Sequence, residues 1–586
     1  MPLVPVKSDT LLSATTFEIF SEGELVPPEI GYASITVQKA INRIPSARLV
    51  LFDGDVTEGD FSVSAGELFV PGKSIEIKAG YNGESKSIFK GTVIRHGIEI
   101  LEGNTSKLVI ELKDPSVKLT VGRKNKYFFD SKDSEILEEI INGYSGISAE
   151  VEDTPTTHAS MVQYYVTDWD FLLTRAEING KLVFVEDSKV VIKKPEVSAD
   201  PKLDLAFGEN VVEFQAEMDA RRQYATSKGF SWDKANQELK EVEASDPGLD
   251  IHGNFSPTEL ADIIGLSDFR LQHIGALDNT ELQAWTDASL LRSRLSKIQG
   301  SIKVTGTNQI KPGDLVKLDG FGERFNGKAF VSSVYHEVTN QSGWFTHLGI
   351  GLEPKFISEV FDDILDRPAA GIIPAIKGLH VGKVTSLEDP DGEHRVRIFI
   401  PVIEPSSEGI WARMASPDAG GGDAARGMFF MPEVDDEVIV GFINEDPRDP
   451  VILGKLYSSA KPAPFEQTED NFQKGLVTKT GLKLVFDDEV KSISLETPNG
   501  NKMTISDEEK GFVLEDENGN KVVLNSDGVQ YESSKDFIIK ASGDVKIEGV
   551  NIEIKASAEL KAEGGAGAEF SSSGATNVKG SLVQIN

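Results

Sequence analysis

The C-terminal part of the chain repeats a simple hydrophobic pattern, in which two apolar residues are separated by one other residue. From residue 537 onward these pairs begin 7 or 8 residues apart. Because strand side chains alternate between two faces, both members of a pair point the same way. The pattern predicts a stack of very short strands joined by Gly- and Ser-containing turns. The pairs are Phe537/Ile539, Val545/Ile547, Ile552/Ile554, Leu560/Ala562, Ala568/Phe570, Thr576/Val578 and Val583/Ile585.

A strand that carries only two apolar residues cannot stabilise itself, so the stripes must face other stripes. A prism built by one chain would need three faces per turn, whereas 7 or 8 residues supply one face. We therefore expect three identical chains to close a β-prism, or β-helix, with few free edges. A flat antiparallel meander with one solvated face is the alternative. The residues predicted to form the trimer core are Val545, Ile547, Ile552, Ile554 and Leu560.

Upstream, between Leu484 and Tyr531, the same pairs recur at longer steps, mostly of 9 or 10 residues. The string NGNK occurs at Asn499 and again at Asn518. Asn-Gly is a strong signal for a tight turn between antiparallel strands. This part of the spike is predicted to have wider strands than the C-terminal repeat.

The N-terminal two thirds of the chain mix strand and helix patterns. Residues 17–119 alternate as strands of a small antiparallel barrel or sandwich. Capping signals then predict helices from Asp133 to Gly143 and from Thr167 to Gly180, followed by a hairpin. Two further helices are predicted within 256–300, and strands resume after them.

Three smaller features of the sequence also lead to predictions. The aromatic Trp285 lies on the longer of those two helices and is expected in the core. The Asp53-Gly-Asp55 run lacks the spacing of a calcium loop and is interpreted as a turn. Five short strands between 379 and 457 suit an OB-type barrel. The predicted fold class is therefore mainly β with helical inserts.

Composition and charge exclude several classes of function. The chain has 586 residues and a net charge of −34, which argues against nucleic-acid binding because phosphates require a basic surface. It has no Cys, so disulfides and thiolate chemistry are excluded. The first residues show no signal-peptide pattern, and no apolar run is long enough to span a bilayer.

The segment from 379 to 457 carries an ordered signature of turn, aromatic and glycine residues. It resembles the spike-barrel domain of VgrG proteins of type VI secretion, and of related spikes from contractile phage tails and extracellular contractile injection systems. One departure is Asp435, where the family usually has Gly. The signature residues are Asp389, Gly392, Arg395, Trp411, Arg413, Gly420, Pro432, Glu437, Gly441, Asp446, Pro447 and Gly454.

The resemblance implies a domain order and a set of partners. It implies a homotrimer whose pseudo-sixfold hub caps a hexameric inner tube, with baseplate proteins, a PAAR-type tip cap and effector cargo as further partners. The cap would sit on Leu582, Val583 and Ile585. The protein would be made in the bacterial cytoplasm and delivered outside the cell, or into a target cell, as part of an injection particle. The implied domains are a first hub β domain at 1–130, a helix-hairpin insert at 131–200, a second hub β domain at 201–365, the OB barrel at 377–457, a linker at 458–475 and the β-helix spike at 476–586.

We expect neither an enzyme nor a cofactor or metal site. Some family members carry a hydrolase beside the barrel, but here only the short linker 458–473 separates barrel and spike. None of the eight His lies in an H-E-x-x-H motif or a nucleophile elbow. The alternatives are a contractile phage hub-spike, which is physically the same device, and, with less support, a trimeric glycan-binding adhesin or a spike with hydrolase activity.

Overall fold

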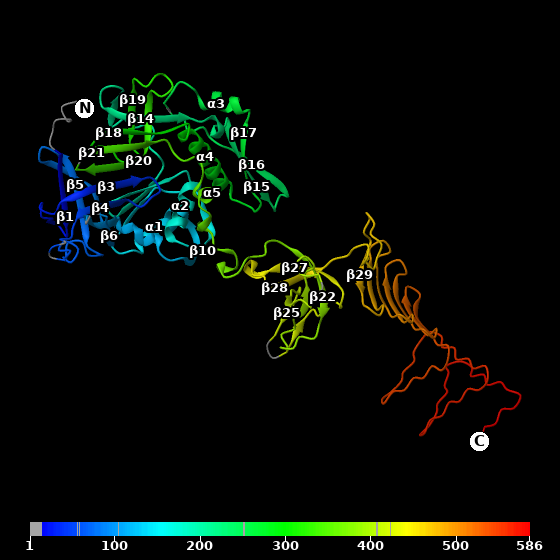
Figure 1. Cartoon of the computed structure of the whole chain (residues 1–586). Coiled ribbons are helices and arrows are strands. Elements are labelled where there is room, and N and C mark those ends of the chain that lie inside the picture. Colours follow the sequence, from blue (N-terminus) through cyan, green and yellow to red (C-terminus); the bar gives the residue numbers. More distant parts are fainter. Residues whose placement is uncertain are drawn as a thin grey trace. The chain divides into compact units, whose positions relative to one another are not determined.

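The computed structural model describes residues 15–585, apart from 56, 58, 103–104, 250–251, 341, 406–407 and 422–423. The expectation of a missing signal peptide concerns residues outside this range. The chain divides into two compact units, Met1–Lys377 with Phe442–Arg448, and Gly378–Gly441 with Asp449–Asn586. Strands dominate both units (Figure 1). The predicted fold class, mainly β with helical inserts, is confirmed.

A 13-stranded sheet forms the frame of the first unit. Its main path runs β14-β18-β21-β20-β3-β4-β7-β6-β5-β1-β2, and β19 joins β13 to β20 beside this path. Its strands are β1 (Thr15–Ser21), β2 (Glu24–Leu25), β3 (Tyr32–Ala40), β4 (Ser46–Phe52), β5 (Ser74–Tyr81), β6 (Glu84–Leu101), β7 (Thr105–Lys113), β13 (Leu203–Ala206), β14 (Val211–Met218), β18 (Ile298–Thr305), β19 (Leu315–Asp319), β20 (Gly327–Thr339) and β21 (Gly343–Ile350).

The first and second β regions expected for the hub are joined within this one sheet. Strand β3 pairs antiparallel with β20, from Ala40 opposite Ser333 to Ser34 opposite Thr339. Each region still keeps its own buried core, one around Leu49 and the other around Val316. Because β3 and β20 pair, their backbone N–H and C=O groups form hydrogen bonds that would be missing if either strand lay at a sheet edge.

The helix-hairpin insert follows its capping signals closely. Helix α1 (Asp133–Asn142) buries its apolar face, and Glu135 accepts a hydrogen bond from the Lys132 N–H. Helix α2 (Asp168–Ile178) begins after Thr167, whose hydroxyl accepts from the Asp170 N–H at 3.1 Å. Both predicted helices are confirmed. The accompanying strands are β8 (Lys124–Lys132), β9 (Ser148–Val151), β10 (Thr157–Val166), β11 (Leu182–Glu186) and β12 (Lys189–Lys193).

The chain segment that connects β14 to β18 contains a second pair of helices and a small three-stranded sheet. Helix α3 (Pro257–Ile264) has the predicted capping box of Ser256 and Glu259, and α4 (Asn279–Leu295) begins after Asp278. The prediction that Trp285 lies in the core is wrong: its side chain is half-buried and lines a cavity of about 360 Å³. Phe269 and Leu271 of the neighbouring sheet line the same cavity. The other elements are β15 (Thr226–Asp233), β16 (Glu238–Glu243), β17 (Asp268–His273), α5 (Ile357–Val360) and the 3₁₀ turns η2 (Pro115–Thr120), η3 (Ala220–Arg222), η4 (Asp362–Ile364), η5 (Pro368–Gly371) and η6 (Ile443–Glu445).

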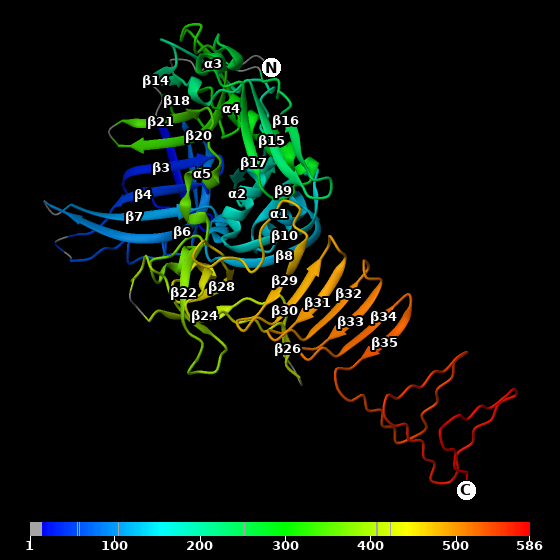
Figure 2. The ribbon, with the colours of Figure 1, turned by 90° about the vertical axis from the view of Figure 1, so that its right-hand side faces the viewer.

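The second unit contains a closed barrel and a meander. The barrel runs β22-β23-β24-β28-β27, and the meander is a seven-stranded antiparallel sheet in sequence order (Figure 2). From 533 to 585 the described residues form neither helix nor strand. The barrel region contains β22 (His380–Ser386), β23 (Val396–Phe399), β24 (Ile410–Met414), β25 (Ala419–Gly420), β26 (Arg426–Gly427), β27 (Glu437–Phe442) and β28 (Pro450–Lys455). The meander contains β29 (Gln473–Val477), β30 (Lys483–Asp487), β31 (Ser492–Glu496), β32 (Lys502–Ser506), β33 (Gly511–Glu515), β34 (Lys521–Asn525) and β35 (Gly528–Glu532).

Candidate functional site

The barrel is filled by alternating residues from its five strands. Val384, Ile398 and Val438 are buried at its centre, as expected for a small barrel whose interior is packed with side chains. Strand β22 pairs antiparallel with β23 and with β27, and β23 pairs antiparallel with β24. Strands β24 and β28 pair in parallel, with Arg413 opposite Val451. The neighbouring strands β28 and β27 close the barrel. The centre of the barrel is therefore packed with side chains.

Asp389 organises the loop between β22 and β23. Its carboxylate accepts backbone N–H groups of Asp391, Glu393 and Arg395 at 3.0–3.1 Å. The Arg395 side chain donates to the same carboxylate, and this charge-assisted pairing holds the pKa of Asp389 well below its usual range. The loop turns at Gly392, whose φ of +70° suits glycine.

Trp411 supports this loop from the neighbouring strand. The guanidinium groups of Arg395 and Arg397 lie 5.9 and 5.7 Å from its ring centroid, within the range of cation–π attraction. The neighbouring Arg413 is exposed. Arg395 is thus held by a carboxylate on one side and an indole on the other.

The remaining signature residues build turns and strand ends. Pro432 is buried before β27, which starts at Glu437, and Gly441 and Gly454 lie on facing strands β27 and β28. These signature residues therefore belong to the turns and strands of the barrel. Gly420 ends β25, which pairs with β26 as a short two-stranded ribbon.

The signature residues Asp446 and Pro447 lie in the segment Phe442–Arg448, which groups with the first unit. There the Arg448 side chain donates to Asp446 at 2.6 and 3.0 Å and lowers the pKa of Asp446 to about 2. Pro447 separates the two paired residues in the sequence.

The resemblance implies Gly at position 435, where this chain has Asp435. Its φ is +74°, in the left-handed region that favours glycine. Its carboxylate lies 2.7 Å from Lys383 Nζ, and this hydrogen-bonded partner lowers the pKa of Asp435. Next to this turn, β22 and β27 pair antiparallel from His380 opposite Val440 to Lys383 opposite Glu437.

The meander aligns the apolar pairs of its strands into two continuous rows on one face. The registers place each pair directly opposite the next, so the sequence pattern becomes two ladders. Leu495 is 48% exposed and Phe512 45%, although both belong to an uninterrupted apolar surface. One ladder holds Leu476, Leu484, Leu495, Met503, Leu514, Val522 and Tyr531, and the other holds Phe486, Ile493, Ile505, Phe512, Leu524 and Val529.

The C-terminal repeat is still more open in a single chain. Every described residue from 533 to 585 is exposed, and no strand pairing holds these residues together. The predicted core residues Val545, Ile547, Ile552, Ile554 and Leu560 are 54–68% exposed, and the predicted cap seat Leu582, Val583 and Ile585 is equally uncovered. An apolar row of this length has no stable place in water unless other chains cover it.

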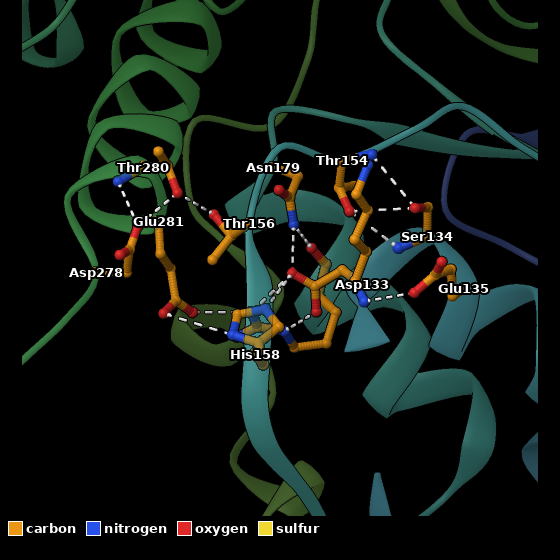
Figure 3. Close-up of polar contacts among 12 residues, drawn as sticks. Asp133, Ser134, Glu135, Thr154, Thr156, His158, Asn179, Asp278, Thr280 and Glu281 are labelled. Carbon is orange, nitrogen blue, oxygen red and sulfur yellow. Dashed lines mark hydrogen bonds and ion pairs between the residues drawn. The ribbon is translucent and has the colours of Figure 1, made fainter. Parts of the chain in front are cut away.

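A buried polar cluster in the first unit looks catalytic but is closed (Figure 3). Arg175 donates to both oxygens of Asp133 at 2.6 and 2.8 Å and to Glu281 at 2.8 Å, and His158 lies 3.1 Å from Asp133. Burial alone would raise the pKa of Asp133, but hydrogen bonds from His158, Arg175 and Asn179 outweigh it and hold that pKa below its usual range. Asp133 is 1% exposed, and the hydrogen bonds of Arg175 to Asp133 and Glu281 join α1, α2 and α4.

Two searches of the described residues complete the survey of sites. They contain no group of three or more His, Cys, Asp or Glu side chains placed to hold a metal ion. None of the helices in this part of the chain has both the length and the apolar character needed to cross a lipid bilayer.

The Asp53 carboxylate accepts hydrogen bonds from the backbone N–H groups of Gly54, Val63 and Ser64, as a turn residue does.

Three protein families match successive parts of the chain. Residues 12–340 match the Alg8 N-terminal domain. Residues 380–457 match the type VI secretion system/phage-baseplate injector OB domain, and residues 492–586 match the phage baseplate V C-terminal trimerisation domain. The barrel and the repeated apolar pairs therefore each correspond to a known domain.

Two curated relatives are similar to part of the chain. The spike protein VgrG1b of Pseudomonas aeruginosa is 24% identical over 41% of this chain and 34% of its own length, and VgrG3 of Vibrio cholerae is 30% identical over 22% and 13%. The chain thus spans about a third of the first relative and 13% of the second. Among solved structures, an E. coli type VI secretion component has a TM-score of 0.36 at 13% identity over 75% of this chain and 99% of its own. A Francisella PdpA-VgrG complex has 0.39 at 10% identity over 90% and 89%.

The barrel followed by a trimerisation domain defines a VgrG-type spike protein of a contractile injection system. The chain belongs to the Alg8 N-terminal domain family, whose domain makes up more than half of its length.

Proposed function

We propose that the protein is a homotrimeric central spike, whose hub caps a hexameric inner tube and whose C-terminal prism pierces the target envelope. The observation that carries this proposal is the pair of apolar ladders on one face of the meander. Seven strands spaced about 4.8 Å apart make a rod face about 29 Å long. Three such faces turned inward bury one another and leave the polar faces in water.

The finer partner assignments follow from the class of protein. A trimeric hub with two β regions per chain offers six similar positions, which match a hexameric tube protein, and baseplate proteins would surround it. A PAAR-type cap would cover the exposed apolar residues Leu582, Val583 and Ile585. Effector cargo would travel with the spike when the particle injects.

We also propose that the protein acts mechanically and not as an enzyme. The buried Asp133 side chain is hydrogen-bonded by His158 and by Arg175, which joins α1 to α2. The purified protein should hydrolyse neither peptidoglycan, glycans nor phosphoesters. Turnover that is lost when a single acidic residue is changed would contradict this.

Light scattering on the full-length protein tests the central proposal. The expected mass is three times 63.7 kDa. A shortened chain that ends at Tyr457 lacks both the meander and the repeat and should lose the trimeric mass. A full-length monomer at micromolar concentration would overturn the proposal.

A further inference from the structure

The first unit contains a cavity of about 360 Å³, which is lined by parts of α2, η3, β17 and α4 and by the chain segment 354–359. These residues come from a single chain, so the cavity needs no second copy. Ligand pockets in proteins commonly have volumes of about 300–1,000 Å³, so a small molecule would fit this one. Four aromatic residues contribute to its wall: Tyr224, Phe269, Trp285 and Phe356.

The aromatic residues of the cavity offer ring surfaces to a flat ligand. The rings of Tyr224 and Phe269 stack on each other, with centroids 4.4 Å apart and an angle of 10° between their planes. The Arg292 guanidinium lies 5.0 Å from the ring centroid of Phe356, so a cation already uses that ring. Phe269 and Trp285 are half-buried and keep surface for a guest. Because aromatic rings attract one another in offset-stacked and edge-to-face arrangements, the cavity favours an aromatic guest.

Two carboxylates line the cavity, and both are already hydrogen-bonded. Glu177 is 5% exposed, and one of its oxygens accepts from Arg292 Nη2 at 2.5 Å while the other accepts from the Ile357 N–H at 2.7 Å. Glu359 accepts from the Phe356 N–H at 2.8 Å, at the start of its own helix. These bonds occupy both carboxylates, so neither one requires a cationic ligand.

Among the described residues that line the cavity, Arg222 is the charged one without a bonded partner. Within this part of the chain, its guanidinium forms neither a hydrogen bond nor an ion pair. Its backbone oxygen accepts from Ser293 Oγ at 2.7 Å, which fixes the residue beside α4. The pKa of Asp219 is lowered mainly by Arg221, whose side chain bonds that carboxylate at 2.6 and 3.0 Å, and the charge of Arg222 adds less.

The unpaired, half-buried guanidinium of Arg222 indicates the charge of a ligand. Burial makes unpaired N–H donors costly, and arginine presents its donors in a planar fork that matches carboxylate and phosphate groups. We propose that the cavity binds a small aromatic anion, whose ring packs against Trp285 and Phe269 and whose carboxylate, sulfonate or phosphate group pairs with Arg222. This site adds a ligand to the mechanical spike proposed above and does not depend on its trimeric state.

Binding at this site also fastens the segment 354–359, which forms one wall of the cavity. Arg292 Nη1 donates to the backbone oxygens of Glu353 and Lys355 at 3.0 and 2.6 Å, and so holds the start of this wall to α4. A guest in contact with Trp285 on α4 and with the segment adds a further link between them. The ligand therefore slows local opening of a segment that precedes the barrel in the sequence.

Fluorescence titration of the full-length protein tests the site with two probes. Anilinonaphthalene sulfonate is an aromatic anion, and phenylnaphthylamine has the same ring system without the sulfonate. Excitation of tryptophan should produce sensitised emission from the bound anionic probe, and this signal should be weaker in Trp285→Phe. Arg222→Gln should weaken binding of the anionic probe by roughly tenfold or more, because it removes charge-assisted hydrogen bonds. The neutral probe should bind the wild type and Arg222→Gln alike.

Arg221→Gln is the matched control, because Arg221 is the neighbouring arginine and its side chain is already bonded to Asp219. This variant should bind both probes as the wild type does. The proposal is overturned if Arg222→Gln binds the anionic probe unchanged, if Arg221→Gln loses as much affinity, or if the neutral probe is lost equally. An undiminished sensitised signal in Trp285→Phe would place the probe elsewhere and also overturn it.

Hydrogen–deuterium exchange gives a second measurement that needs only the wild-type protein. Saturating anionic probe should slow exchange in peptides that cover 354–359 and leave strand β5 unchanged. The melting temperature of Arg222→Gln should match that of the wild type, because its guanidinium bonds to no group in the described part of the chain. Exchange in 354–359 that does not respond to the probe would contradict the proposed site.

Discussion

Arg395 donates from Nε and Nη2 to the two carboxylate oxygens of Asp389, at 3.0 and 2.7 Å, across a six-residue separation in the sequence. The carboxylate is 4% exposed while the guanidinium retains 25%. The pair closes the loop between β22 and β23 with fixed geometry, because a bidentate arginine constrains direction as well as distance.

Asp389→Asn should therefore destabilise the barrel in a pH-dependent way. Hydrogen bonding to Arg395 lowers the folded-state pKa of Asp389, so its contribution is present above the ordinary value of about 3.9 and is lost as the pH falls through the folded-state value. Thermal melting should show a lower melting temperature for the variant at pH 7 and a shrinking difference below pH ~4. Asp391→Asn, whose 68% exposed carboxylate makes one bond to Arg395, is the control. Equal losses in both variants would contradict the role given to Asp389.

Met503→Glu should abolish the trimer, whereas Thr504→Glu should not. The two residues are adjacent on β32 but lie on opposite faces, and only Met503 belongs to an apolar ladder between Leu495 and Leu514. In the proposed trimer the new carboxylate would enter the apolar interior three times, where an unpaired charge costs several kcal/mol. Light scattering of both variants decides this. Dissociation by Thr504→Glu instead would mean that the other face is the inner one.

Changes at Asp435 should rank by how well each residue tolerates a φ of +74°. Asp435→Gly should raise the melting temperature of the barrel, since glycine enters the left-handed region without steric cost. Asp435→Ala should lower it, because alanine adds a Cβ and also loses the ion pair to Lys383. Asp435→Asn isolates the charge, because asparagine tolerates the same backbone. An alanine variant as stable as the wild type would show that the turn can relax.

Asp133→Asn should destabilise the first unit by about 3 kcal/mol or more, because it leaves the buried Arg175 guanidinium short of a charge partner. Glu135→Gln, on the same helix but exposed, should cost about 1 kcal/mol or less. Urea unfolding followed by tryptophan fluorescence measures both. Similar midpoints for the two variants would show that the cluster contributes little.

Local signals in the sequence predicted local structure well. The caps at Thr167 and Ser256 placed helix starts, because they satisfy backbone groups within a few residues. The two NGNK strings fall between strands, with Gly500 at φ +92° and Gly519 at +83°. The apolar pairs of the meander aligned as expected because a two-residue period fixes the face of each side chain.

Features that depend on distant residues were not predicted. The pairing of β3 with β20 could not be predicted from the sequence of either strand, because both show only the ordinary alternation of a strand. The cluster around Asp133 is formed by residues of three helices that are far apart in the sequence. No regular spacing of these residues along the chain predicts it. Trp285 was assigned to the core on its residue type, whereas the structure places it on a cavity wall.

The pairing of β3 with β20 can form only after both strands have been synthesised. Tyr32–Ala40 leaves the ribosome long before Gly327–Thr339, and at roughly 5–20 residues per second the wait is roughly 15–60 s. Throughout that interval the nascent chain carries an open strand edge beside a finished half-sheet, which invites pairing with other nascent chains on the same message. A chaperone that shields this edge, or slow codons placed after Ala40, would then govern the yield of spikes per cell more than the stability of the finished protein does.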